Sequence, residues 1–233
     1  MRKIAIITGA SSGIGEAIAH KFDQGGITVI LVAKNGIKIK KSLKNFILKP
    51  IAFKADIRKE KEVAIMLRKV IRKYKRVDIL VNCAGVWGNN RIEDSSNKEI
   101  NIIIDTNLKE AIYCTKTVVP CMKKQGAGQI ININATAGKT GSPYRSVFCA
   151  SKFGLSGFSE SIYKELKDDG IKVATIYTGM VATKGILNSK ITSKAQIRGA
   201  LDLDDIANMA WVIINQGEKS NIKEIYLTSI KSP

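Results

Sequence analysis

The chain has 233 residues, which is enough for one sizeable hydrophobic core and too few for two domains of typical size. Its hydrophobic content of 45% and charged content of 25% are ordinary for a globular protein, and no apolar run approaches the roughly 20 residues needed to span a bilayer. The formal net charge of +18 is unusual, and it fits either a nucleic-acid or acidic-membrane partner or a bias toward lysine on solvated surfaces.

The distribution of the basic residues favours the second interpretation. They are dispersed along the chain, and the densest run, from Lys38 to Lys44, falls where a surface helix is expected. We therefore expect no nucleic-acid partner and no membrane association. The four cysteines lack metal-ligand spacing, so we expect no metal site and no disulfide framework, only buried thiols of a cytoplasmic protein.

Apolar runs and amphipathic stretches alternate along the chain. The runs are rich in isoleucine and valine and mostly do not alternate with polar residues, as expected for strands buried on both faces. The expected strands are Ile4–Thr8, Thr28–Val32, Ile51–Lys54, Ile79–Asn82, Gln129–Ile133, Val173–Tyr177 and Ile225–Leu227. The expected helices are Ile14–Phe22, Val63–Tyr74, Thr106–Lys124, Phe148–Lys167 and Asp204–Asn215.

This alternation predicts an α/β fold with a doubly wound, Rossmann-like parallel sheet of about seven strands and helices on both faces. No linker rich in glycine, proline or serine interrupts residues 1–233, so we expect one domain. The ligand crevice should lie at the carboxyl ends of the strands.

A glycine-rich loop, Thr8-Gly9-Ala10-Ser11-Ser12-Gly13-Ile14-Gly15, follows the first expected strand and opens the first expected helix. Glycines permit a tight turn and a close approach of the backbone to a pyrophosphate, and the start of a helix supplies N–H groups and positive potential. An ordinary strand-to-helix turn is the alternative. The context on both sides favours cofactor binding.

The end of the second strand indicates which nicotinamide cofactor fits. An acidic residue there would hold the ribose 2′-hydroxyl of NAD, whereas a basic residue would accept the 2′-phosphate of NADP. Ala33 occupies the acidic position and Lys34 follows it. NADP(H) is therefore favoured over NAD(H), although Lys34 could also be one more surface lysine.

Several spaced motifs together resemble the short-chain dehydrogenase/reductase family. The glycine loop has that family's Thr-Gly-x-x-x-Gly-x-Gly form, Asn82-Cys83-Ala84-Gly85 is similar to its Asn-Asn-Ala-Gly, and Thr178–Thr183 to its Pro-Gly-x-Val-x-Thr. The resemblance covers almost the whole chain. It implies cofactor contacts at Thr8, Gly9, Ser11, Ser12, Gly13, Ile14, Gly15, Ala33, Lys34, Asn35, Asp56, Ile57, Asn82, Ala84, Gly85, Lys152, Gly179, Val181 and Thr183.

The same resemblance locates the catalytic positions, and two of them lack their usual hydroxyl. Asn107 and Lys152 match the family's asparagine and lysine, but Ala135 stands at the serine position and Phe148 at the tyrosine position. The 13-residue interval from Ala135 to Phe148 and the helical turn from Phe148 to Lys152 fix this alignment. Phe148 cannot donate a proton and Ala135 cannot donate a hydrogen bond. A rescue by Tyr144, four residues before Phe148, is the less favoured alternative to a pocket-lining role.

Two functions are compatible with complete cofactor motifs and incomplete catalytic positions. The first is an NADP(H)-dependent carbonyl reductase or alcohol dehydrogenase that is catalytically impaired, and the second is a natural NADP(H)-binding pseudoenzyme or scaffold. Each replacement removes one hydroxyl and keeps the shape of the side chain, so deliberate inactivation of an active reductase would also explain the first function. We expect residues 179–201 to cover a small or medium apolar carbonyl substrate, and the resemblance implies a homotetramer or homodimer.

Overall fold

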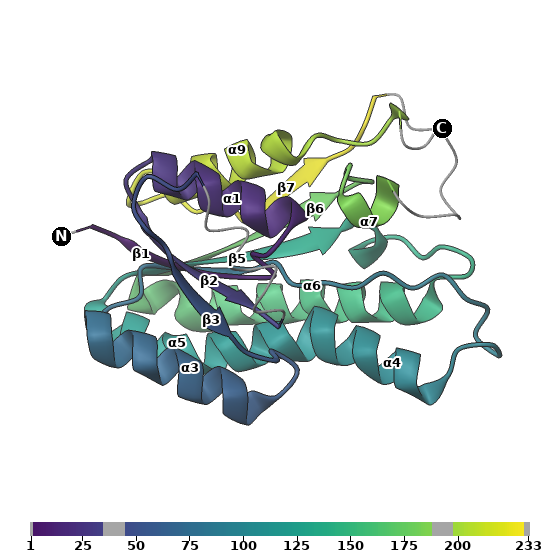
Figure 1. The fold of residues 1–233 in the computed structure, drawn as a ribbon, viewed down its shortest axis with the longest axis horizontal. Coiled ribbons are helices and arrows are strands. Elements are labelled where there is room, and N and C mark those ends of the chain that lie inside the picture. Colours follow the sequence, from purple (N-terminus) through teal and green to yellow (C-terminus); the bar gives the residue numbers. More distant parts are fainter. Residues whose placement is uncertain (1, 35–44, 188–197, 231–233) are drawn as a thin grey trace.

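The computed structural model describes residues 2–34, 45–187 and 198–230, and a parallel sheet of seven strands lies at its centre (Figure 1). The strand order is β3-β2-β1-β4-β5-β6-β7, which confirms the doubly wound prediction. The order reverses between β1 and β4, so the crevice is expected where those two strands end. The strands are β1 (Ile4–Thr8), β2 (Thr28–Ala33), β3 (Ile51–Lys54), β4 (Ile79–Asn82), β5 (Gly128–Ala135), β6 (Ile171–Thr178) and β7 (Glu224–Leu227).

Helices cover both faces of the sheet. Figure 1 shows α1 and α9 on one face and α3, α5 and α6 on the other. The helical segments are α1 (Gly13–Gln24), α3 (Glu60–Tyr74), α4 (Asn97–Ile104), the π-helical turn η1 (Asp105–Lys109), α5 (Glu110–Gln125), the 3-10 turn η2 (Thr136–Gly138), α6 (Ser146–Leu166), the 3-10 turn η3 (Lys167–Asp169), α7 (Lys184–Leu187) and α9 (Leu203–Ile214).

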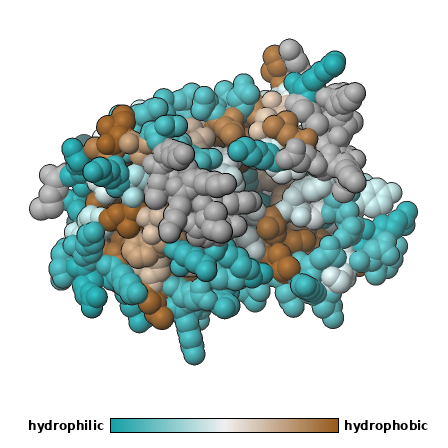
Figure 2. Space-filling view, viewed as in Figure 1, coloured by the Kyte–Doolittle hydropathy of each residue, from teal (hydrophilic) through white to brown (hydrophobic). Residues whose placement is uncertain are grey.

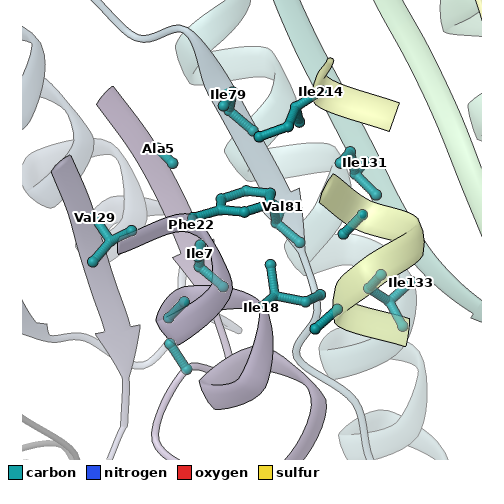
Figure 3. Packing of buried hydrophobic residues seen from close by; sticks show 14 of the residues in the cluster. Ala5, Ile7, Ile18, Phe22, Val29, Ile79, Val81, Ile131, Ile133 and Ile214 are labelled. Atoms are coloured by element: carbon teal, nitrogen blue, oxygen red, sulfur yellow. The ribbon is translucent and has the colours of Figure 1, made fainter. Parts of the chain in front are cut away.

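The apolar strands contribute side chains to two separate hydrophobic cores, one on each face of the sheet. In β1, Ala5 and Ile7 pack toward α1 and α9, whereas Ile4 and Ile6 belong to the cluster under α3, α5 and α6. Figure 3 shows the first core, where Phe22 of α1 lies among side chains of the strands. Because successive side chains of a strand point to opposite faces, continuous apolar runs are needed to fill both cores.

Two helical features differ from the prediction. Helix α4 was not predicted, although Ser96 and Glu99 form a capping box at its start. The helix predicted over Thr106–Lys124 is not one regular helix, because the π-helical turn η1 joins α4 to α5. The surface helix expected from Lys38 to Lys44 lies outside the described residues.

The visible surface is mainly hydrophilic, with small hydrophobic groups between the polar side chains (Figure 2). Within residues 2–34, 45–187 and 198–230, no helix combines the length and apolar character that crossing a membrane requires.

The end of β1 and the segment after β4 approach each other closely. The Thr8 hydroxyl accepts hydrogen bonds from the backbone N–H groups of Cys83, at 3.0 Å, and Ala84, at 3.2 Å. Gly9 has φ +64°, and a Cβ added there would stand 2.8 Å from the Cα of Ala84. Only glycine fits this backbone conformation and this gap without strain.

Replacing Gly9 by alanine should therefore destabilise the fold. Left-handed backbone strain and the clash with Ala84 together predict a loss of about 2–4 kcal/mol in the free energy of unfolding, measured by urea denaturation. Gly141→Ala is the matched control, because a Cβ at Gly141 would meet nothing within 4 Å. Equal changes in the two variants would contradict the assigned role of Gly9.

Candidate active site

The glycine loop turns the chain from β1 into α1 at the reversal of the strand order. Gly9 and Gly13 both have left-handed backbone conformations, with φ of +64° and +61°. Ser12 is the N-cap of α1, but its side chain makes no capping hydrogen bond. The first N–H groups of α1 are thus not taken up by the Ser12 hydroxyl and can meet an anion.

The segment after β6 lies opposite the glycine loop. A Cβ added at Gly13 would lie 3.3 Å from Cγ2 of Thr183, so the loop and Thr183 face each other at close range. Gly179 donates its N–H to the Leu227 carbonyl at 2.7 Å, and Val181 is buried in the core. Of the three positions predicted after β6, Thr183 therefore lies beside the glycine loop, whereas Gly179 is fixed by its backbone hydrogen bond and Val181 by burial.

Backbone contacts join the two ends of residues 179–201, the segment predicted to cover the substrate. Val181 and Leu201 form a parallel bridge, and Leu201 donates its N–H to the Met180 carbonyl at 2.8 Å. Residues 184–187 form α7, and residues 188–197 of the predicted segment lie outside the described residues.

A small ionic cluster marks the ends of β2 and β3. Lys34 lies 3.3 Å from the carboxylate of Asp56, and Arg58 binds the same carboxylate through contacts of 2.7 and 2.9 Å. The Arg58 guanidinium holds the pKa of Asp56 well below its usual range. The sequence pattern did not single out Arg58. Asn35, which was also predicted to bind the cofactor, lies outside the described residues, and Ile57, another predicted position, is buried in the core.

The residues predicted after β4 lie at the same edge of the sheet, next to the end of β1. Asn82 is buried, and its amide nitrogen donates to Oδ1 of Asn132 at 2.8 Å, which ties β4 to β5. Ala84 and Gly85 follow it, and a Cβ at Gly85 would lie 3.6 Å from Oδ1 of Asn107.

Asn107 lies in the middle of the π-helical turn η1 and clamps the segment after β4. Its side-chain nitrogen donates to the Val86 carbonyl at 2.9 Å, and its oxygen accepts from the Val86 N–H at 2.8 Å. The same nitrogen donates to the Ser151 hydroxyl of α6 at 3.0 Å. Single π-helical turns inside α-helices are frequent at functional sites, and this one positions Asn107 between two elements.

Lys152 carries its ammonium group into the interior between β5 and α6. The residue is 6% exposed, and its Nζ donates to the Ile133 carbonyl at 3.1 Å. Burial lowers the pKa of Lys152 to about 8. At neutral pH, the site thus holds an ammonium group that loses its proton far more readily than an ordinary lysine.

The two positions without a hydroxyl lie on the two elements that surround Lys152. Ala135 ends β5 and Phe148 lies in the first turn of α6, and both are partly exposed. The turns that carry them are held together, because Asn134 donates to the Lys152 carbonyl at 3.2 Å and Ser156 donates to the Gly138 carbonyl at 2.9 Å.

A small pocket opens beside Phe148. It is lined by Gly88, Asn89, Asn90, Ser95, Glu99, Ile100, Ile103, Tyr144, Arg145, Val147 and Phe148. Tyr144 lies in this lining with φ +64°, an unusual conformation for a residue with a side chain. Several lining residues are polar, so the pocket is more polar than the apolar substrate expectation suggested.

The single histidine and the four cysteines also carry groups that can react or bind metals. His20 stacks on Phe46 with ring centroids 4.0 Å apart. All four cysteines are free thiols, and the described part of the chain contains no cluster of three His, Cys, Asp or Glu residues that could hold a metal ion.

Comparisons with known proteins agree with this geometry. The family model described as short chain dehydrogenase matches residues 3–194. An uncharacterized oxidoreductase of Staphylococcus epidermidis is 29% identical over 228 residues, which cover 98% of this chain and 97% of the relative. The D-beta-hydroxybutyrate dehydrogenase of Rhizobium meliloti is 33% identical over 207 residues, or 85% of this chain and 79% of the relative. A metagenomic short-chain oxidoreductase solved in complex with NADP has 28% identity and a TM-score of 0.84 over 97% of this chain and 96% of that chain.

Removing the buried ammonium group of Lys152 should stabilise the folded protein when no cofactor is bound. The folded pKa of Lys152 is about 8 against an ordinary 10.5, so its burial penalty is full below pH 8 and disappears as the pH rises through 10.5. Lys152→Met should raise the free energy of unfolding at pH 7 by about 1–3 kcal/mol, with the gain shrinking above pH 8. Lys69→Met, at an exposed position of α3, is the control. A loss of stability at pH 7 specific to Lys152→Met would contradict the assigned burial penalty.

Proposed function

The chain belongs to the short-chain dehydrogenase family, and on that premise we propose that it is an NADP(H)-dependent oxidoreductase with impaired catalysis. We propose the carbonyl reductase or alcohol dehydrogenase type, which interconverts an alcohol and a ketone or aldehyde. The observation that carries the proposal is the site around Lys152, where a buried ammonium lies one helical turn from Phe148 and behind the end of β5 at Ala135.

The residues of the crevice fit a dinucleotide. A Cβ at Gly9 would lie 2.8 Å from the Cα of Ala84, and a Cβ at Gly13 would lie 3.3 Å from Cγ2 of Thr183, so glycines let the loop pass close to both neighbouring segments. The start of α1 offers N–H groups to a pyrophosphate, and Lys152 would hold the nicotinamide ribose.

The corner at the end of β2 supports NADP(H). Lys34 and Arg58 place two positive charges around the single carboxylate of Asp56, which leaves a net positive corner for a 2′-phosphate. Lys34 is 64% exposed, so its ammonium can reach a ligand. The NADP of the metagenomic short-chain oxidoreductase also supports this choice.

The impairment follows from what these side chains can donate. NADPH, when bound, supplies a hydride to a carbonyl carbon. The chain must then deliver a proton to the carbonyl oxygen, and neither Phe148 nor Ala135 carries a hydrogen that an oxygen anion could accept. Loss of a general acid costs roughly 10²–10⁴ in rate, and loss of a hydrogen-bond donor to the oxygen about 10²–10³.

A non-catalytic NADP(H)-binding protein is the second candidate function. The same crevice supports it, and the missing hydroxyls favour it over an ordinary reductase.

Within the catalytic proposal, the polar lining near Arg145 fits a small carbonyl compound with a polar group, in keeping with the name of the hydroxybutyrate dehydrogenase relative. We also propose that α5 and α6, the helices beside Asn107 and Phe148, assemble the chain into a homodimer or homotetramer.

Reversing the charge of Lys34 tests the cofactor preference. Lys34→Glu should weaken NADPH binding relative to NADH by about 10–100-fold, because a charge-assisted contact to the 2′-phosphate becomes a repulsion. Fluorescence titration of both cofactors measures the ratio. Lys69→Glu makes the same charge change at an exposed position of α3 and should leave the ratio unchanged. An unchanged ratio in Lys34→Glu would contradict the role of Lys34.

Restoring the two hydroxyls tests the impairment. The double variant Ala135→Ser with Phe148→Tyr should oxidise NADPH at least about 10³-fold faster with a panel of small carbonyl compounds, since the two effects need not multiply fully. Phe153→Tyr, which adds a phenol at an exposed position of α6, is the matched control and should gain nothing. Measurable turnover that is equal before and after restoration would contradict the impairment. No turnover in either form, with NADPH still bound, would favour the non-catalytic protein.

A further inference from the structure

Arg145, at the start of α6, brings a positive charge into the pocket that Phe148 also lines. Among the described arginines, the half-buried ones are Arg58, Arg76 and Arg145, and the first two each pair with an aspartate two residues away. Within the described parts of the chain, no carboxylate lies within 4 Å of the Arg145 guanidinium. A half-buried charge is costly without a partner, so this guanidinium is available to an anionic ligand.

An aromatic ring holds the Arg145 guanidinium in place. Its Cζ lies over the ring of Trp87, 5.1 Å from the ring centroid. A guanidinium over an aromatic ring can still donate hydrogen bonds from its N–H groups. Trp87 follows Val86, whose backbone N–H and carbonyl are both hydrogen-bonded to the side chain of Asn107. The ring that carries Arg145 therefore belongs to a segment that the site itself fixes.

The other charged groups at this pocket already have partners. The charged residues of the described lining are Arg145 and Glu99. Glu99 accepts a hydrogen bond from the Asn90 amide at 2.9 Å and completes the capping box at the start of α4. Arg91, whose guanidinium lies over the ring of the lining residue Tyr144, is 3.6 Å from the carboxylate of Glu93. The charge that the pocket can offer to a ligand is thus the positive charge of Arg145.

Arg145 also lies close to the position where a carbonyl group would react. It precedes Phe148 by three residues, and both residues line the same pocket. Residues three apart on a helical turn have Cβ atoms about 5–6 Å apart, a distance that a molecule of four or five carbons spans. The ketone of such a molecule can lie beside Phe148 while its other end meets Arg145. A carboxylate fits that end, because a guanidinium binds it through two parallel hydrogen bonds.

We propose that Arg145 binds a carboxylate of the substrate, so that the substrates are a short keto acid and the corresponding hydroxy acid. This role of Arg145 rests on the proposed function, in which the reacting carbonyl group lies beside Phe148. It concerns binding and adds no chemical step to the interconversion of a ketone and an alcohol.

The test measures ligand binding by the whole chain saturated with NADP, because the oxidised cofactor has no hydride to give to a ketone. Titration calorimetry compares acetoacetate and 4-oxopentanoate with their neutral amides, which keep the ketone and the size of the acid but lack its charge. At least one acid should bind about 10–100-fold more tightly than its amide, because a charge-assisted contact is lost in the amide. This comparison uses the unaltered chain, so it does not depend on the folding of a variant.

Variants then assign the preference to a residue. Arg145→Gln should bring the acid to within about threefold of its amide, because glutamine is uncharged. Arg68→Gln removes the same charge from an exposed position of α3 and should keep the preference. NADP affinity should be the same in both variants, which checks that they fold. Arg145→Lys serves if Arg145→Gln does not fold, and it should weaken the preference about threefold or more because lysine lacks the planar fork.

The outcomes separate the role of Arg145 from the proposed function. Equal binding of acids and amides, or no binding of either by the NADP-saturated chain, would overturn the role of Arg145 and leave the proposed function standing. A preference for the acid that persists in full in the Arg145 variants would overturn it as well. If the unaltered chain does not bind NADP, the proposed function fails and the role of Arg145 fails with it.

Discussion

The burial of a charged ammonium group is the constraint on which the rest of the site depends. Lys152 places that group between β5 and α6, where the Ile133 carbonyl is its hydrogen-bond acceptor. A buried charge is costly unless nearby dipoles and charges compensate for it. The Ile133 carbonyl supplies one such dipole, and the buried amides of Asn132 and Asn134 hold α6 against β5 so that Lys152 keeps this position.

The network that fixes α6 also explains why the missing hydroxyls leave the architecture unchanged. Asn134 and Ser156 connect β5 and η2 to α6, and Asn107 connects η1 to Ser151. None of these contacts uses the side chain of residue 135 or 148. Lys152 and the turns around it are therefore held in place without a hydroxyl at position 135 or 148, which is consistent with the proposal that the chain binds a cofactor but has impaired catalysis.

Sequence reasoning succeeded where local spacing decides the structure. The glycine loop, the seven strands and the turn from Phe148 to Lys152 all depend on short-range geometry or continuous apolar runs, and the structure places them as predicted. The π-helical turn at Asn107 could not be predicted in this way, because it depends on contacts with Val86 and Ser151, which are distant in sequence. Whether the predicted site residues act as proposed remains a prediction.

Charged residues were harder to place from sequence. Glu110 looks like an ordinary first-turn acid of a helix, and only the fold shows that it is buried and that its carboxylate accepts a weak hydrogen bond from the Cys114 thiol. Arg58 looks like one more basic residue in a chain of charge +18, yet it shares the Asp56 carboxylate with Lys34. The asparagines of β5 were a usable signal, since polar residues in an isoleucine-rich strand need buried partners.

A crystal structure of the unaltered chain grown with NADP tests the central claim most directly. The account predicts the pyrophosphate on the loop from Gly9 to Gly15, the 2′-phosphate beside Lys34 and Arg58, and the Lys152 ammonium within hydrogen-bonding distance of the nicotinamide ribose. It also predicts that the ring of Phe148 lies beside the nicotinamide with no hydroxyl in reach of a substrate oxygen. A crevice that stays empty at saturating NADP, or a nucleotide bound away from Lys152, would contradict it.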